Sequence, residues 1–302
     1  MHVSKLNLNL QYNLLGPAHF NFNIEAAHTP LQRIVSESVS VLPGPNLHRY
    51  VDEKSGNRFL RFDAGAGLLD VNYQATIELQ PQAPAEGLYE VAVSDVPDDV
   101  LRFMMPSRYC ESDVMSRSAQ QIFGRMATGY DRVKAVTEWV RDSVAYLPGS
   151  TTSTTTAQEV FVLRAGVCRD YAHLAITMCR ALNIPARLVV GYVNFEEPPQ
   201  DFHAIFEAWL GGRWVLFDPS GLAPVDRLVR IGTGRDAKDV AFATIFGPAQ
   251  MTSKQVWVDE SDNGVTGQTV VIPAPSSQAE AGTGTMPAPS PAQQEQLSVA
   301  TA

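Results

Sequence analysis

The sequence has few cysteines, no long apolar run and no cluster of basic residues. Its 302 residues include three cysteines, Cys110, Cys168 and Cys179. So small and odd a set does not provide the framework of a disulfide-stabilised fold, and we expect three reduced thiols. Residues 6–10 alternate leucine with asparagine. The amino-terminal region therefore lacks the continuous apolar stretch that is typical of a signal peptide.

These absences limit the classes of function. No window approaches the roughly 18 consecutive apolar residues of a membrane helix. The formal net charge is −9, whereas nucleic-acid binders usually present a basic patch or stripe. The histidines and cysteines lack the spacing of a zinc site, and no calcium-loop pattern occurs. We therefore expect a cytoplasmic protein without a membrane partner, a nucleic-acid partner, a metal or a cofactor.

Residues 1–105 have the period-two pattern of β-strands. Short runs of alternating apolar and polar residues are separated by turns rich in glycine, proline and asparagine, which predicts a sandwich-like β domain. The region contains no constellation of chemically active residues. His19, His28 and His48 are scattered along it, and we interpret them as ordinary surface or core histidines.

The pattern becomes helical after Pro106. Helices are predicted at about residues 112–126, 131–145, 157–164 and 168–182. The last of these has apolar residues on nearly every side, which is typical of a buried helix. Strands are predicted after it, at about residues 186–193, 202–209, 213–217 and 226–231.

This pattern indicates three parts. Residues 1–105 form the β domain, and residues 106–272 form a second domain in which helices pack on an antiparallel sheet. Residues 273–302 consist mainly of Pro, Ala, Gly, Ser, Thr and Gln. That composition offers almost no large apolar residues for a core, so we expect disorder there. The fold class is therefore α+β.

Cys168 is predicted to lie at the start of the buried helix. A helix N-terminus carries partial positive charge and unpaired N–H groups, and both stabilise a thiolate. Arg169 adds positive charge beside it. The alternative is a buried structural cysteine. Cys179 fits that alternative better because it lies in the middle of the helix among apolar residues, and Cys110 has no acid–base partner near it in the sequence.

A nucleophilic thiol needs an imidazole, and the imidazole needs an orienting carboxylate. Residues 202–209 and 213–218 read as a β-hairpin that carries His203 and Asp218. If Gly211 and Gly212 form the loop, Asp218 lies two residues from the position opposite His203, on the same face. If Leu210 and Gly211 form it, the two residues face each other directly. In both registers the two side chains lie on one face, within reach of each other. A loop with an odd number of residues would place them on opposite faces of the hairpin.

The residues around these positions form recognisable motifs, namely GVCRDYAHL at 166–174, NIPAR at 183–187 and GYV at 191–193. His203-Ala204 and Asp218-Pro219-Ser220 follow in order, and GRDAKDV stands at 234–240. Over roughly residues 107–250 the chain resembles the core of the transglutaminase-like superfamily, and within it the bacterial transglutaminase-like cysteine proteases. The β domain is similar to the one that often precedes this core.

The resemblance implies a papain-like core, in which the helix that carries the cysteine packs on an antiparallel sheet that carries the histidine and the aspartate. It assigns Cys168 as the nucleophile, His203 as the general base and Asp218 as the orienting residue. One departure is Ile205, where these proteins usually have tryptophan. No side-chain donor to an oxyanion is identified, although Tyr146 and the Ser/Thr loop after it are candidate wall residues. We interpret His173 as structural.

The leading functional hypothesis is a cysteine peptidase or isopeptidase that acts on a peptide or protein through an acyl-enzyme on Cys168. A second hypothesis is protein-glutamine transglutamination, in which an amine replaces water as the acceptor. A third is a non-catalytic interaction module with the same fold, which would not need all three residues. A fourth is an amidase acting on a non-protein amide.

Overall fold

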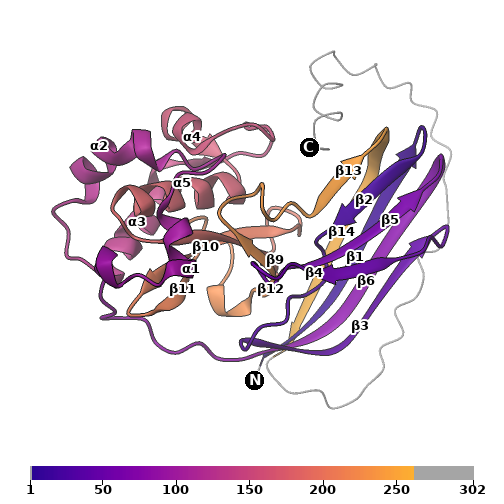
Figure 1. Ribbon diagram of the computed structural model, residues 1–302, viewed down its shortest axis with the longest axis horizontal. Helices are drawn as coiled ribbons and strands as arrows, with labels where there is room; N and C mark the ends of the chain where they lie inside the picture. The colour runs from indigo at the N-terminus through magenta and orange to yellow at the C-terminus, as the bar shows by residue number, and fades with distance from the viewer. Residues whose placement is uncertain (1, 262–302) are drawn as a thin grey trace.

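The computed structural model describes residues 2–261, which form two lobes (Figure 1). One lobe contains two β-sheets that face each other, and the other contains the longer helices and a third sheet. This confirms the predicted α+β class, with an antiparallel sheet in the helical lobe and a sandwich-like lobe before it in the chain. The segment 273–302, for which disorder was predicted, lies outside the described residues.

The sandwich consists of two four-stranded sheets. One has the order β14 (Ala249–Ser261), β1 (His2–Leu14), β6 (Gly67–Leu79) and β3 (Gln32–Leu42). The other has the order β13 (Ala243–Phe246), β2 (Ala18–Phe22), β5 (Arg58–Ala64) and β4 (His48–Val51). Alternate residues of β1 and β2, including Leu8, Leu10 and Phe20, are buried in a shared core. The period-two pattern of the sequence thus marks the faces that the two sheets bury against each other.

The predicted domain boundary is wrong at its carboxy-terminal side. We assigned residues 106–272 to the second domain, but β13 pairs with β2 and β14 pairs with β1 along almost its whole length. The chain returns to the sandwich after the helical lobe and adds one strand to an edge of each sheet (Figure 1). Local sequence could not indicate this, because strand partners more than 200 residues apart leave no mark on periodicity.

The helical lobe contains a sheet with the order β11 (Arg213–Phe217), β10 (His203–Leu210), β9 (Ala186–Tyr192) and β12 (Val229–Gly234). Its longer helices are α2 (Ser112–Phe123), α3 (Tyr130–Ser143), α4 (Ala157–Leu163) and α5 (Cys168–Ala181). The remaining elements are short: α1 (Asp98–Leu101), β7 (Ala145–Tyr146), β8 (Ala165–Gly166) and the 3-10 turns η1 (Val93–Asp95), η2 (Arg102–Met104) and η3 (Val225–Arg227). Each of the longer helices begins within one residue of its predicted start, whereas β12 begins later than predicted because η3 occupies residues 225–227.

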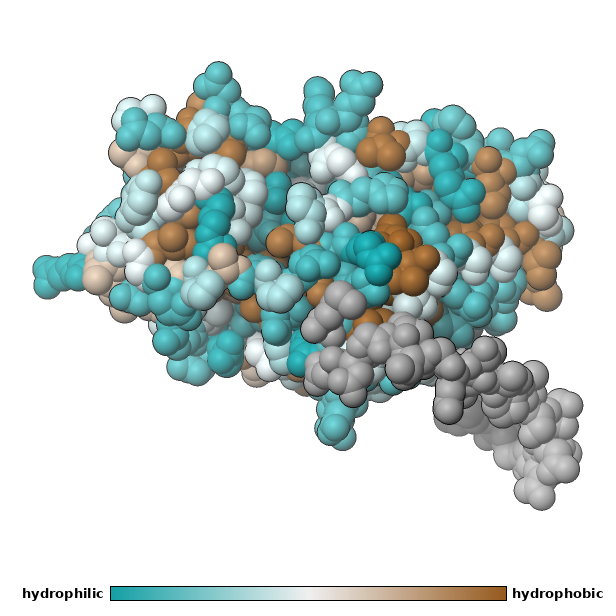
Figure 2. All heavy atoms as spheres, turned by 90° about the horizontal axis from the view of Figure 1, so that it is seen from below, coloured by the Kyte–Doolittle hydropathy of each residue, from teal (hydrophilic) through white to brown (hydrophobic). Residues whose placement is uncertain are grey.

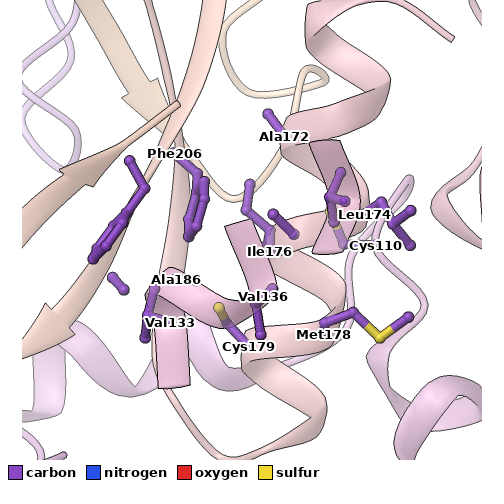
Figure 3. Close-up of a cluster of buried hydrophobic side chains, with 14 of the residues drawn as sticks. Cys110, Val133, Val136, Ala172, Leu174, Ile176, Met178, Cys179, Ala186 and Phe206 are labelled. Atoms are coloured by element: carbon purple, nitrogen blue, oxygen red, sulfur yellow. The ribbon is translucent and has the colours of Figure 1, made fainter. Parts of the chain in front are cut away.

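Helix α5 is the centre of this lobe. Every residue from Asp170 to Ala181 is buried, as the all-round apolar pattern predicted. The helix contacts β9 and β10 as well as α2, α3 and α4. Figure 3 shows its side chains, such as Ile176, in one core with Val136 of α3 and Phe206 of β10. Contacts on all sides fix the position of the helix N-terminus.

The two lobes share buried surface. Tyr192 of β9 and Ile231 of β12 belong to the sandwich core, and the Tyr192 hydroxyl donates to the Ile24 carbonyl at 2.7 Å. The Asn57 side chain pairs with the backbone of Thr233, accepting from its N–H at 2.9 Å and donating to its carbonyl at 3.0 Å. Gln32 does the same for Arg230, at 2.9 Å in each direction. Side chains of the sandwich lobe thus complete the hydrogen bonding of an edge strand in the other lobe.

On the face shown in Figure 2, apolar residues form separate patches among hydrophilic ones, several of them over the sandwich lobe. Within residues 2–261, none of the helices combines the length and the hydropathy that crossing a bilayer requires.

Candidate active site

Cys168 is the first residue of α5, and it is half-buried. The first turn is held by the buried Asp170, whose Oδ2 accepts from the Val167 backbone N–H at 3.0 Å and from the Thr151 hydroxyl at 2.5 Å. A carboxylate at this position caps the helix and complements its dipole. Gly166 permits the close approach, because a Cβ there would lie 2.7 Å from the Asp170 Cβ. The sulfur therefore sits at a rigid helix N-terminus.

The hairpin that carries His203 has an even loop. Leu210 pairs with Arg213, so Gly211 and Gly212 form a two-residue turn. Their φ angles are +56° and +82°, a conformation in which side chains are strained and glycine is not. This is the first of the two registers considered from the sequence, with Asp218 diagonal to His203. Nε2 of His203 lies 3.0 Å from Oδ2 of Asp218.

Asp218 is oriented by several donors. Its Oδ1 accepts from the backbone N–H of Ser220 at 2.8 Å and from the Ser220 hydroxyl at 2.7 Å. Nη2 of Arg141 on α3 donates to the Asp218 backbone carbonyl at 3.0 Å. Burial alone would raise the pKa of this carboxyl, but the hydrogen bonds from His203 and Ser220 and the charge of His203 lower it. Asp218 is therefore ionised, and its carboxylate is held in one orientation.

His203 is buried between the carboxylate and the thiol. Burial alone would lower its pKa, but hydrogen bonding with Asp218 and Cys168, and their charges, raise the pKa to about 10. Because Nε2 of His203 faces Asp218, Nδ1 is the ring nitrogen available to the Cys168 thiol. Within residues 2–261, Nδ1 makes no hydrogen bond of regular geometry. Catalytic hydrogen bonds are often long without substrate, and this arrangement suits a thiolate–imidazolium pair.

The other two cysteines are enclosed. Cys110 and Cys179 have no exposed surface, and burial raises the pKa of both thiols, that of Cys110 to about 12. His173 is also enclosed: its Nε2 accepts from the Ala237 N–H at 3.1 Å and its ring stacks on Tyr109. These buried surroundings agree with a structural role for Cys110, Cys179 and His173.

Ile205, the departure from the family pattern, is buried in a small apolar cluster that includes Val189, Phe195 and Leu216. Phe195 also packs on the His203 ring, with 5.7 Å between the ring centres. Ile205 therefore fills the core beneath the histidine.

Two residues that hold the candidate site in place, Asp170 at the helix start and Arg141 at Asp218, were not singled out from the sequence. The capping role of Asp170 was open to prediction, since an acidic residue three positions after the N-cap is a known helix-start signal. The contact of Arg141 with Asp218 had no local signal, because 77 residues separate them. Among the described residues, no three or more His, Cys, Asp or Glu side chains gather as ligands for a metal ion.

The family comparisons cover both lobes. The transglutaminase-like superfamily matches residues 116–219, a range that includes Cys168, His203 and Asp218, and the amino-terminal domain of bacterial transglutaminases matches residues 3–98. The first match lies within the predicted range of roughly 107–250, and the second supports the resemblance stated for the β domain.

Known proteins with similarity over most of the chain include a crystal structure described as "a Putative Cysteine Protease from Cytophaga hutchinsonii". It has 40% sequence identity and a TM-score of 0.83, covering 88% of this chain and 92% of that one. An uncharacterized protein of Mycobacterium leprae is 31% identical over 252 residues, covering 75% of this chain and 86% of the relative. One from Mycobacterium tuberculosis is 38% identical over 109 residues, which is 32% of this chain and 35% of that protein.

Proposed function

Because the chain belongs to the transglutaminase-like superfamily, we propose that it is a cysteine peptidase or isopeptidase that cleaves amide bonds through an acyl-enzyme on Cys168. The observation that carries this proposal is the buried His203 ring, whose Nε2 lies 3.0 Å from Asp218 and whose pKa is raised by Asp218 and by the nearby Cys168 thiol. A fold kept only as a scaffold would not need these three groups together.

The proposed reaction uses each group once per half-reaction. The Cys168 thiolate attacks the carbonyl carbon, a C–S bond forms, and the C=O electron pair moves to oxygen. When the C=O bond re-forms, the C–N bond breaks and the His203 imidazolium gives its proton to the leaving amine. His203 then takes a proton from water, whose oxygen attacks the thioester carbon and forms a C–O bond. The C–S bond breaks, the acid is released, and the Cys168 thiolate and the His203 imidazolium are regenerated. Asp218 keeps the ring in place and stabilises its charge.

The first test is alkylation of the thiols by iodoacetamide as a function of pH, with mass spectrometry to locate each adduct. We expect Cys168 to be labelled well below pH 8, because a neighbouring imidazolium and a helix N-terminus favour the thiolate. His203→Ala should shift this profile, and Cys168→Ala should abolish the adduct. A wild-type Cys168 that reacts no faster than a free thiol would contradict the proposal and favour the non-catalytic interaction module.

Transglutamination is the second candidate, because its acyl-enzyme is the same and the acceptor alone differs. The bacterial transglutaminase amino-terminal domain that matches residues 3–98 favours keeping it. Incubation with a glutamine-containing protein and a fluorescent primary amine separates the two. A peptidase releases new termini and incorporates no amine, whereas a transglutaminase incorporates the amine and leaves the backbone intact. An enzyme for non-protein amides would give neither product and would still show a reactive Cys168.

A further inference from the structure

A cavity of about 520 Å³ opens between the two lobes. One wall belongs to the sandwich and consists of β4, β5 and the turn between them, with Tyr50, Lys54 and Phe59. The other wall consists of η2, the end of β12 and the residues after it, and it includes Arg102 and Arg235. Cavities of several hundred Å³ at the junction of two structural units are preferred sites for small ligands.

This cavity is separate from the candidate active site. Gly234, which lines the cavity, pairs with Leu188 on β9, whereas His203 pairs with Gly191 on the same strand. Three residues of an extended strand span roughly 10 Å, so the cavity lies toward the other end of the sheet. It is lined in part by the GRDAKDV motif at 234–240, to which the proposed catalysis gives no role.

Aromatic rings lie on both walls of the cavity. Tyr50 and Phe59 are opposite each other on β4 and β5, and their half-buried rings stack with 5.1 Å between the ring centres. Phe103 lies on the facing wall, and the guanidinium of Arg102 is over its ring, 4.7 Å from the ring centre. Flat apolar surfaces of this kind favour a ligand that contains a planar ring.

The charged side chains of the cavity carry a net positive charge. They are three cations and two acids, namely Lys54, Arg102, Arg235, Asp52 and Asp239. Asp239 is paired with Arg235, with 2.8 Å between Oδ2 and Nε. Asp52 is engaged by Ser55, whose backbone N–H and hydroxyl donate to its Oδ2 at 2.8 and 2.5 Å. Each acid therefore already has donors of its own.

Arg102 and Lys54 are the cations left for a ligand. Nη2 of Arg102 donates to the Lys54 backbone carbonyl at 3.1 Å, a bond that joins the two walls. Within residues 2–261, neither side chain forms an ion pair. The whole chain has a formal net charge of −9, so a positive cavity in it attracts anions to one place. The planar guanidinium suits the geometry of a carboxylate or a phosphate.

We propose that this cavity binds a small organic anion that carries an aromatic ring. The anionic group pairs with Arg102 and Lys54, and the ring packs against Tyr50, Phe59 and Phe103. Such a ligand contacts both lobes at once, so its binding stabilises the folded chain. The site goes beyond the proposed function and does not depend on the chemistry of Cys168.

Isothermal titration calorimetry of the full chain tests the site, with 2-naphthoate as the probe. From the usual affinity per atom of small ligands, we expect a Kd of roughly 1 mM or lower. 2-Naphthamide keeps the ring without the charge, and acetate keeps the charge without the ring. Each should bind at least roughly tenfold more weakly than 2-naphthoate. 2-Naphthyl phosphate is the second anion, and the tighter of the two identifies the anionic group as carboxylate or phosphate.

Variants place the binding in this cavity. Arg102→Ala should weaken the binding of 2-naphthoate roughly tenfold, because it removes the charge that meets the carboxylate. Phe59→Leu should weaken it roughly threefold, because it removes a ring surface. Arg117→Ala is the matched control, since Arg117 lines a depression of about 540 Å³ on α2 that consists of arginine and glutamine side chains. It should leave the Kd unchanged.

Thermal unfolding of each variant verifies that the chain is folded. If Arg102→Ala does not fold, Arg102→Gln keeps a donor for the Lys54 carbonyl, removes the charge and should show the same loss of affinity. A loss confined to the Arg102 and Phe59 variants supports the site. No measurable binding of 2-naphthoate, equal affinity for 2-naphthamide, or equal losses in the Arg102 and Arg117 variants overturns it. The reactivity of Cys168 enters none of these results, so the proposed function is tested separately.

Discussion

Three cysteines in one chain have three different environments, and exposure separates them. Cys168 is half-buried at a helix N-terminus, whereas Cys110 and Cys179 are enclosed in the core. A thiol reacts as its thiolate, and an apolar enclosure opposes that charge. Local exposure therefore favours reaction at the Cys168 thiol over the Cys179 thiol, even though both residues lie on the same helix.

Replacing these cysteines should give opposite results. Cys168→Ala is expected to abolish amide cleavage, because no other accessible thiol can form the acyl-enzyme. Cys179→Ala should keep most of the activity and lose some stability through a small core cavity. Turnover and unfolding are measured on both variants. Full activity in Cys168→Ala, or its complete loss in a folded Cys179→Ala, would refute the site assignment.

The protonation of His203 has a predictable pH dependence. Because its pKa is raised to about 10, the ring should stay an imidazolium up to that pH and should lose its proton as the pH rises through it. The stability gained from the charged ring is fully present below roughly pH 6.5, the ordinary pKa of histidine. It declines as the pH rises from there and is gone above the folded-state pKa of about 10. Protonation of the leaving amine should fail there too, because the acid is then neutral.

Nitrogen NMR of the histidine rings measures this directly. The chain has six histidines, and His203→Gln identifies the signal of interest. Asp218→Asn removes a carboxylate that raises the pKa of His203. In this variant the His203 ring should therefore titrate at lower pH than in the wild type. A wild-type His203 that titrates near its ordinary value of roughly 6.5 would rule out the charged pair.

At the scale of elements, one buried carboxylate joins three strands of the third sheet. Glu207 on β10 accepts from Nε of Arg187 on β9 at 2.7 Å and from Arg230 on β12. Burial alone would raise the pKa of Glu207, but the charges and hydrogen bonds of both arginines lower it. The strand that begins with His203 is therefore tied to its neighbour β9 and to β12 beyond it. We infer that the position of the imidazole depends on this sheet.

Glu207→Gln should destabilise the protein by about 3 kcal/mol, because it leaves two largely buried arginines without their counter-ion. Glu138→Gln is the matched control. Glu138 is exposed, and its ion-pair partner within residues 2–261 is Lys134 at 3.8 Å, so its loss should cost no more than about 0.5 kcal/mol. Denaturant unfolding gives both free energies. Equal values for the two variants would show that the three-strand link contributes nothing beyond a surface pair.

Across the whole molecule, the two lobes share buried core residues and hydrogen bonds. The chain leaves the sandwich after β6, builds the helical lobe and returns as β13 and β14. The sandwich lobe also supplies hydrogen bonds and core contacts to β9, which pairs with the strand of His203, and to β12 on the other side of β9. We therefore expect a single unfolding transition and expect the sandwich to be needed for a properly formed site.

Asn57→Ala tests this coupling between lobes. The side chain satisfies both the N–H and the carbonyl of Thr233, and it is buried. Its removal leaves two buried backbone groups unpaired and should cost about 2 kcal/mol, with a lower rate of Cys168 alkylation if the coupling reaches the site. Asn46→Ala, at an exposed position, should change neither quantity. Two separate unfolding transitions in the wild type would contradict the single cooperative unit.

Features that depend on neighbouring residues can be predicted from the amino-acid sequence. Helix periodicity placed Cys168 at the first position of α5, and two glycines at the tip of the hairpin allowed the turn that brings His203 and Asp218 to one side. Such features follow from local backbone preferences and from the spacing of apolar residues.

Contacts between distant segments become visible only in the folded chain. The return of β14 to β1, the hold of Arg141 on Asp218 and the pairing of Tyr146 with Gly166 each join residues that no local pattern connects. Their energies depend on a packed core that exists only once the chain has folded, so they leave no periodic signal in the sequence.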